Sequence, residues 1–200
     1  MSTVVQFRLQ PSPPSSAPES PAQRRVRIGS LWLSYLFAGL FGLAVCVLVT
    51  AVAVMLFYKG EWVRIGPDNC YIGGGPPNSV AFGSLPLDQR LAYVVAGGLR
   101  AVPIIMLFWT VRSLFAGFAR GRVFSRGVAV HFRRIGVWLC AYALSPFACH
   151  LLLSATGYEI DKNWAHLASV QAFILGLLVF VIGQVMQVGR EIEEDREAFV

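Results

Sequence analysis

Residues 119–136 read ARGRVFSRGVAVHFRRIG and concentrate five arginines between two long apolar segments. In membrane proteins, Lys and Arg gather in the short loops on the cytoplasmic side of the spans. The stretch therefore predicts that the chain crosses a membrane before and after it, and that the stretch itself faces the cytoplasm. Its arginines are Arg120, Arg122, Arg126, Arg133 and Arg134.

The composition agrees with this interpretation. The chain has 200 residues, of which 56% are hydrophobic and only 14% are charged, and its mean hydropathy is +0.59. It is too apolar for an ordinary soluble domain. A helix that crosses a hydrocarbon core of about 30 Å needs about 20 mainly apolar residues. Four segments meet this requirement, at about 31–57, 91–118, 132–155 and 164–188. We expect an all-α integral membrane protein with four transmembrane helices in a bundle, formed by residues 24–200.

The distribution of basic residues predicts the orientation. Four arginines precede the first span, of which Arg24, Arg25 and Arg27 lie at its edge, five lie around the junction of the second and third spans, and two follow the fourth. The other two loops together carry only Lys59, Arg64, Arg90 and Lys162. By the positive-inside rule, both termini are expected in the cytoplasm and residues 59–90 and 156–163 outside. The arginines lie beside spans, so lipid accounts for them better than direct binding of nucleic acid.

Two segments outside the spans have their own character. Residues 1–23 are rich in Pro and Ser without apolar periodicity, which predicts a disordered tail. In the first outer loop, residues 61–65 and 70–72 flank a Gly-Pro-Asp-Asn turn, which is typical of a short β-hairpin. Gly73 to Gly75 form no phosphate loop, because they open no helix and no Gly-Lys-Ser/Thr follows them.

Polar side chains within the spans form a second group of candidates. Arg100 and Arg112 both fall in the second span, and Gln171 falls in the fourth. Arg100 can snorkel toward an interface, or it can hold a ligand or lipid headgroup. Pro103 frees the carbonyl of Leu99, which predicts a kink and a local hydrogen-bond acceptor near Arg100. No Asp or Glu lies in the four spans, which excludes an intramembrane carboxylate relay.

The end of the chain, GREIEEDREAFV, is strongly acidic. It is expected on the same membrane face as the arginine stretch. Either the acids dock on those arginines, or they form a solvated charged end, since exposed ion pairs contribute only about 0 to 1 kcal/mol each. The candidate partner-binding residues are the five arginines named above with Glu191, Glu194 and Asp195.

Catalytic and metal-binding patterns are missing from the sequence. It has no Gly-x-Ser-x-Gly elbow and no His-Glu-x-x-His motif, and Ser145 and His150 are five residues apart, which does not place them on one helical face. His150 and His166 lack the spacing of a metal pair. The four cysteines indicate three apolar fillers and one loop thiol, with a Cys70–Cys149 disulfide as the alternative. No enzymatic activity, cofactor or metal is expected.

The residues 112–136 and 185–200 resemble a family of small bacterial membrane proteins, the domain-of-unknown-function 2975 family. The family has an Arg-Leu-Phe motif, a Gly-x-x-Phe turn, an Arg-Arg-Ile-Gly helix start and a Gly-x-x-Leu-x-Glu tail that ends in Val. The matching positions are Leu114-Phe115, Gly121 with Phe124, Arg133 to Gly136, and Gly189, Ile192, Glu194 and Val200, whereas Phe199 stands where a Thr is expected. The resemblance implies four membrane helices in the bacterial cytoplasmic (inner) membrane and, for many members, a neighbouring gene for a helix-turn-helix regulator. It implies no known activity.

Together these features predict a non-enzymatic accessory or signalling protein. Its basic loop and acidic tail are expected to contact a cytoplasmic regulator protein, and its other partners are membrane lipids and further copies of the chain. The alternative is a small oligomeric transporter or channel. Its path would be lined by Arg100, by the helix kinks at Pro103 and Pro146, and by the amides of Gln171, Gln184 and Gln187.

Overall fold

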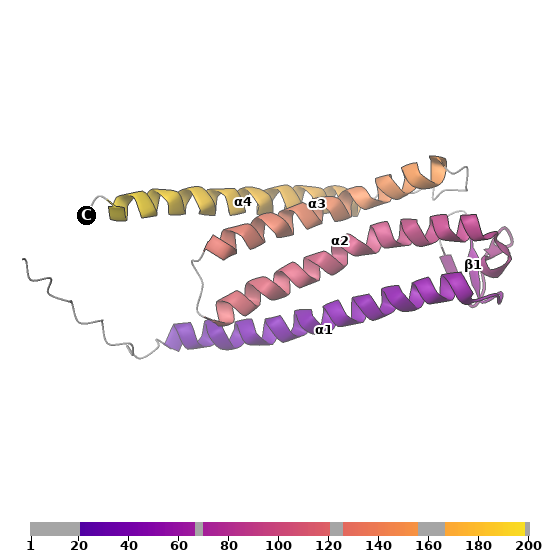
Figure 1. Ribbon diagram of the computed structural model, residues 1–200, viewed down its shortest axis with the longest axis horizontal. Helices are drawn as coiled ribbons and strands as arrows, with labels where there is room; N and C mark the ends of the chain where they lie inside the picture. Colours follow the sequence, from indigo (N-terminus) through magenta and orange to yellow (C-terminus); the bar gives the residue numbers. More distant parts are fainter. Residues whose placement is uncertain (1–20, 67–69, 121–125, 156–166, 199–200) are drawn as a thin grey trace, which may run out of the picture.

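The computed structural model describes residues 21–66, 70–120, 126–155 and 167–198 (Figure 1). Four long helices account for most of them: α1 (Pro21–Phe57), α2 (Leu87–Ala119), α3 (Arg126–Ala155) and α4 (Leu167–Ala198). All four are long and apolar enough to cross a membrane, over Arg27–Phe57, Leu87–Ala119, Gly127–Ala155 and Leu167–Gly189. The chain is therefore a multi-pass helical membrane protein.

The helices extend beyond the apolar segments. α1 begins at Pro21 instead of residue 31, α3 begins at Arg126 instead of residue 132, and α4 continues to Ala198 instead of residue 188. Arg, Glu and Ala are good helix formers, and Pro is favoured at a first helical position, so the helices continue where the apolar segments end. Residues 1–20 of the predicted tail, together with Arg122 and the Gly121–Phe124 turn, lie outside the described residues.

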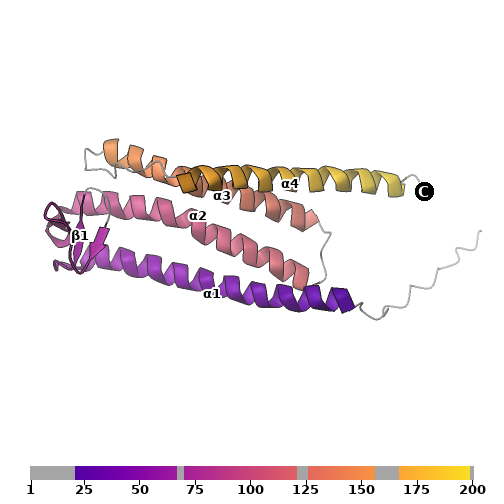
Figure 2. The same cartoon turned by 180° about the vertical axis from the view of Figure 1, so that it is seen from behind.

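The helices pack mainly on their neighbours in sequence. Figures 1 and 2 show them in a row, with α1 and α4 on the two outer sides. The start of α1, the end of α2, the start of α3 and the end of α4 lie together at one end of this row, which we call the charged end. Buried apolar residues are few and mostly small. Many large apolar side chains of the helices are exposed, as the lipid-facing surface of a membrane protein requires.

Each contact between neighbouring helices has a different chemistry. α1 meets α2 through aromatic rings: Phe37 stacks on Phe115 at 5.9 Å, and Phe41 lies 5.2 Å from Trp109 between ring centres. α2 meets α3 where the Cys149 thiol donates to the carbonyl oxygen of Ala96 at 3.2 Å. Because Cys149 is a free cysteine in this interface, the alternative of a Cys70–Cys149 disulfide is wrong.

α3 and α4 approach each other through glycines. A Cβ atom at Gly136 would lie 2.6 Å from the carbonyl oxygen of Gly176, and one at Gly183 would lie 2.9 Å from the backbone nitrogen of Arg133. Gly176 and Gly183 belong to a row of small residues on one face of α4. Their lack of side chains brings the two backbones into contact. In α1, by contrast, a Cβ at Gly39 or Gly42 would meet nothing within 4 Å.

A small folded cap, residues 59–86, covers the other end of the row between α1 and α2 (Figure 2). Its three short strands, β1 (Val63–Ile65), β2 (Cys70–Ile72) and β3 (Val80–Ala81), pair antiparallel in the order β2-β1-β3 and lead into a 3-10 turn, η1 (Phe82–Ser84). Residues 67–69, the centre of the predicted hairpin turn, lie outside the described residues. Phe82, 1% exposed, forms the centre of the cap and meets the ring of Tyr93 edge-on.

Candidate functional site: a basic pocket at the charged end

Those predicted partner-binding residues that the structure describes belong to the charged end, but they occupy different elements. Arg120 is the exposed C-cap of α2, and Arg133 and Arg134 are exposed on α3. Arg126 is the first residue of α3, whereas Arg122 lies outside the described residues. The structure therefore divides the arginine stretch between two helices.

The predicted acidic residues lie on the last turns of α4, which stays helical to Ala198. Gly183 of α4 lies beside the backbone of Ala129 and Arg133 in α3. Glu191 is eight residues further along, about 12 Å at 1.5 Å per residue. Figures 1 and 2 both show the end of α4 projecting past the first turn of α3. Docking of the acids on the arginines remains a prediction.

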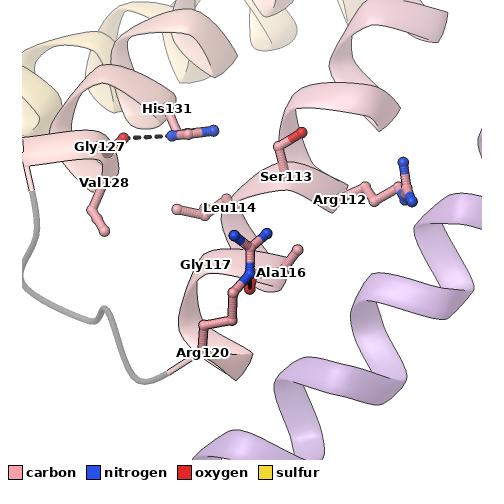
Figure 3. Close-up of a pocket in the computed structure, with 9 residues that line it drawn as sticks. All are labelled: Arg112, Ser113, Leu114, Ala116, Gly117, Arg120, Gly127, Val128 and His131. Carbon is pink, nitrogen blue, oxygen red and sulfur yellow. Dashed lines mark hydrogen bonds between the residues drawn. The ribbon is translucent and has the colours of Figure 1, made fainter.

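A pocket of about 320 Å³ opens where the end of α2 meets the start of α3. Such a volume is at the lower end of the range for small-molecule sites. Figure 3 shows the walls of the pocket, which come from the last two turns of α2 and the first two turns of α3. The lining residues include three basic side chains and no carboxylate: Arg112, Ser113, Leu114, Ala116, Gly117, Arg120, Gly127, Val128 and His131.

Arg120 is held at the mouth of the pocket by its own helix. Its Nε donates to the carbonyl oxygen of Ala116 at 3.1 Å. That carbonyl belongs to the last turn of α2, where backbone acceptors lack intrahelical donors. The contact leaves the two Nη groups directed between the helices, toward the side where Ser113 and His131 lie (Figure 3). The guanidinium is thus oriented before any ligand arrives.

His131 lies on the opposite wall. Its Nδ1 hydrogen-bonds the carbonyl oxygen of Gly127 one turn earlier, so Nδ1 carries the proton. The ring then presents Nε2 to the space between α3 and α2 (Figure 3). His131 is not among the residues selected from the sequence, because the predicted third span begins at residue 132 and leaves His131 in the preceding loop. The i, i+4 relation between Gly127 and His131 becomes a contact once the helix begins at Arg126.

Arg112 lines the pocket but directs its charge elsewhere. Its guanidinium turns toward α1 (Figure 3) and lies 5.0 Å from the centre of the Trp109 ring. A cation over an indole face at this distance is attracted by the ring electrons. The predicted intramembrane site is therefore not a single cluster, because Arg112 is engaged with Trp109 near the charged end.

The other two members of the predicted intramembrane group are exposed. Arg100 lies on the surface of α2, one turn after Ala96, and Gln171 lies on the surface of α4. α2 packs chiefly on α1 and α3, and α4 packs chiefly on α3. Within the described parts of the chain, no group of three or more His, Cys, Asp or Glu side chains could hold a metal ion. His166 lies outside those parts.

Comparison with known protein families gives one match. A family model described as a protein of unknown function (DUF2975) matches residues 77–200, from just before β3 to the end of the chain. That range contains α2, α3, α4 and the whole basic pocket. No curated protein and no solved structure matches the chain.

Proposed function

The chain belongs to the DUF2975 family of proteins of unknown function, and we propose that it serves a bacterial cytoplasmic membrane as a non-enzymatic accessory or signalling component. In this proposal the charged end faces the cytoplasm and binds a regulatory protein. The partner contacts the arginines at the ends of α2 and α3 and the acidic last turns of α4.

The observation that carries the proposal is the length of α4. Its apolar span ends at Gly189, yet the helix continues to Ala198. The nine residues 190–198 include five acidic residues and two arginines. A helix that leaves the membrane and projects past its neighbours offers a partner a charged surface with its backbone already ordered, which lowers the entropy cost of binding.

The cytoplasmic orientation rests on the arrangement of basic groups along the row. The exposed Arg24, Arg25, Arg120, Arg133 and Arg134 all belong to the charged end. At the other end of the row, two basic side chains serve the local fold, since Arg64 of the cap and Arg90 in the first turn of α2 both donate to backbone carbonyl oxygens. The excess of basic residues at the charged end supports placing it in the cytoplasm.

Site-specific photocrosslinking tests the proposal. A photoreactive residue at Arg134 or Glu194 should capture one cytoplasmic protein in living cells, whereas the same residue at Trp62, in the cap, should not. The purified captured protein should then bind the full chain in detergent. Combined substitution of Glu191, Glu194 and Asp195 by Lys should weaken that binding about 10-fold or more, since charge-assisted contacts contribute about 1.5–3 kcal/mol each. Equal capture from Trp62, or binding unaffected by the charge reversal, would contradict the proposal.

A small oligomeric transporter or channel has less support from the described residues. Such a protein needs polar groups directed at a shared path. The buried hydroxyls of Thr110 and Ser145 instead donate to carbonyl oxygens of their own helices, those of Met106 at 2.7 Å and Tyr142 at 2.8 Å. Solute flux into liposomes that is lost on Arg100→Ala would favour the transporter.

A further inference from the structure

We infer that the basic pocket between α2 and α3 binds a phosphate group, in the form carried by the headgroup of an anionic phospholipid. This inference concerns a lipid and does not depend on the protein partner proposed above. It rests on the placement of three kinds of donor around one cavity and on the level of that cavity in the membrane.

The first kind of donor is the guanidinium of Arg120. Its Nε is occupied by the carbonyl oxygen of Ala116. The Nη groups face the cavity (Figure 3) and keep the geometry that bonds two phosphate oxygens side by side. Because the Nε contact orients the side chain in advance, binding costs less side-chain entropy than at a freely rotating arginine.

The second and third kinds of donor come from α3. His131 directs Nε2 into the cavity, and because Nδ1 keeps its proton for the Gly127 carbonyl oxygen, Nε2 donates to an anion only when both ring nitrogens are protonated. Gly127 and Val128, in the first turn of α3, also line the cavity. Backbone N–H groups of a first turn lack intrahelical acceptors and carry the positive end of the helix dipole. The first turn of α3 contains no acidic residue that could accept from them instead.

The depth of the cavity in the membrane favours a lipid headgroup as its ligand. The apolar helices that border it end at Ala119 and begin at Gly127, which supports a position for the cavity near the edge of the hydrocarbon region, where headgroups are found. Leu114 and Val128 are buried in its wall and supply an apolar side beneath the basic groups. Basic pockets between membrane helices at this level suit anionic headgroups.

Ligand-dependent thermal stability of the full chain in a neutral detergent tests the inference. Three probes are titrated at constant ionic strength: short-chain phosphatidylglycerol, short-chain phosphatidylcholine and inorganic phosphate. A ligand that binds only the folded state raises the unfolding midpoint as its concentration passes the dissociation constant. We expect phosphatidylglycerol to act at about 10-fold lower concentration than phosphatidylcholine, which has the same phosphodiester but no net charge.

Two variants and two controls locate the effect. Arg120→Gln removes the oriented donor and should weaken phosphatidylglycerol binding about 10-fold. Gly117→Leu changes no charge and fills the cavity, since a Cβ at Gly117 meets nothing within 4 Å, and should weaken binding similarly. Arg134→Gln removes a charge from the same end outside the cavity, and Gly39→Leu adds the same side chain elsewhere. Both controls should change the affinity by less than about twofold.

Each outcome bears on the inference. Saturation by inorganic phosphate as readily as by phosphatidylglycerol, with the same dependence on Arg120 and Gly117, would support the phosphate site and assign it to the free ion. Equal action of phosphatidylcholine and phosphatidylglycerol would overturn the inference. Gly117→Leu that binds phosphatidylglycerol as tightly as the parent would also overturn it. The same holds if Arg134→Gln and Arg120→Gln lose equal affinity for phosphatidylglycerol. Helical content by circular dichroism verifies that each variant is folded.

Discussion

At the scale of single residues, two glycines set the distance between α3 and α4. A Cβ at Gly136 would lie 2.6 Å from the carbonyl oxygen of Gly176 and 2.7 Å from the backbone nitrogen of Phe180. Both neighbours are backbone atoms, so a clash can be relieved only by separating the helices. We expect Gly136→Ala to lower the free energy of unfolding by about 1–3 kcal/mol, the usual cost of overpacking. Thermal unfolding in detergent measures the loss.

Gly42→Ala in α1 is the matched control. It is the same substitution in a membrane helix, but the new methyl group meets nothing within 4 Å. Alanine also has the higher helix propensity, so this variant should be as stable as the parent or more stable, by up to about 1 kcal/mol. Equal unfolding midpoints for the two variants would show that the α3–α4 contact does not depend on the missing side chain.

The surroundings of Arg112 are set by the helix next to it and not by its spacing from Arg100. Two arginines twelve residues apart in one span suggested an intramembrane polar site. The structure turns Arg112 toward α1 and over the Trp109 ring, and leaves Arg100 exposed on α2. Spacing along a helix gives the separation of two side chains, but the neighbouring helix decides what each one meets.

At the scale of elements, Arg64 holds the cap together. From β1 its Nε donates to the hydroxyl oxygen of Ser79 at 3.0 Å and its Nη2 to the carbonyl oxygen of Ser79 at 2.9 Å. The Ser79 hydroxyl in turn donates to the carbonyl oxygen of Pro76, and Ser79 is 5% exposed. Because buried acceptors are costly to leave unpaired, Arg64→Met should open the cap while the four helices stay folded.

Limited proteolysis measures this opening. With a protease of broad specificity, so that the lost arginine removes no cleavage site, residues 59–86 should be cut about 10-fold faster in Arg64→Met than in the parent. Lys59→Met is the control, because Lys59 is an exposed basic residue of the same segment. Faster cutting within α2 or α3 would mean that Arg64 stabilises the whole chain and not the cap alone.

The helix boundaries show which part of an element can be predicted from hydropathy. The sequence located all four helices, because the apolar segments record where lipid surrounds the chain. It did not locate their ends: α3 starts at Arg126, six residues before the predicted residue 132, and α4 ends at Ala198, ten residues after the predicted residue 188. Those extensions are charged, and charge ends a lipid-facing segment without ending a helix. The basic pocket lies at one of these extended ends.

At the scale of the whole molecule, the packing order explains why the site was only partly predictable. The sequence identified the arginine stretch, and with it Arg120, as the region of interest. It did not identify Ser113, Gly117 or His131, because these residues share a cavity only once α2 and α3 pack side by side. The four helices are arranged as an open row, in which α1 and α4 lie on opposite sides (Figure 1). The hydropathy of each segment predicts a helix, whereas the pocket depends on how α2 and α3 pack together, which hydropathy does not predict.

The same row yields a prediction about orientation. Val80 in β3 and Val128 in α3 lie at opposite ends of the row, and Ala198 lies at the same end as Val128. If the charged end is cytoplasmic, alkaline phosphatase fused after residue 80 should be active, because this enzyme needs disulfides that form only outside the cytoplasm. Fusions after residues 128 and 198 should both be inactive. Phosphatase activity from the fusions after residues 128 and 198, but not from the fusion after residue 80, would mean that the charged end faces outward. Activity from only one of the fusions after residues 128 and 198 would show that the start of α3 and the end of α4 do not share a membrane face.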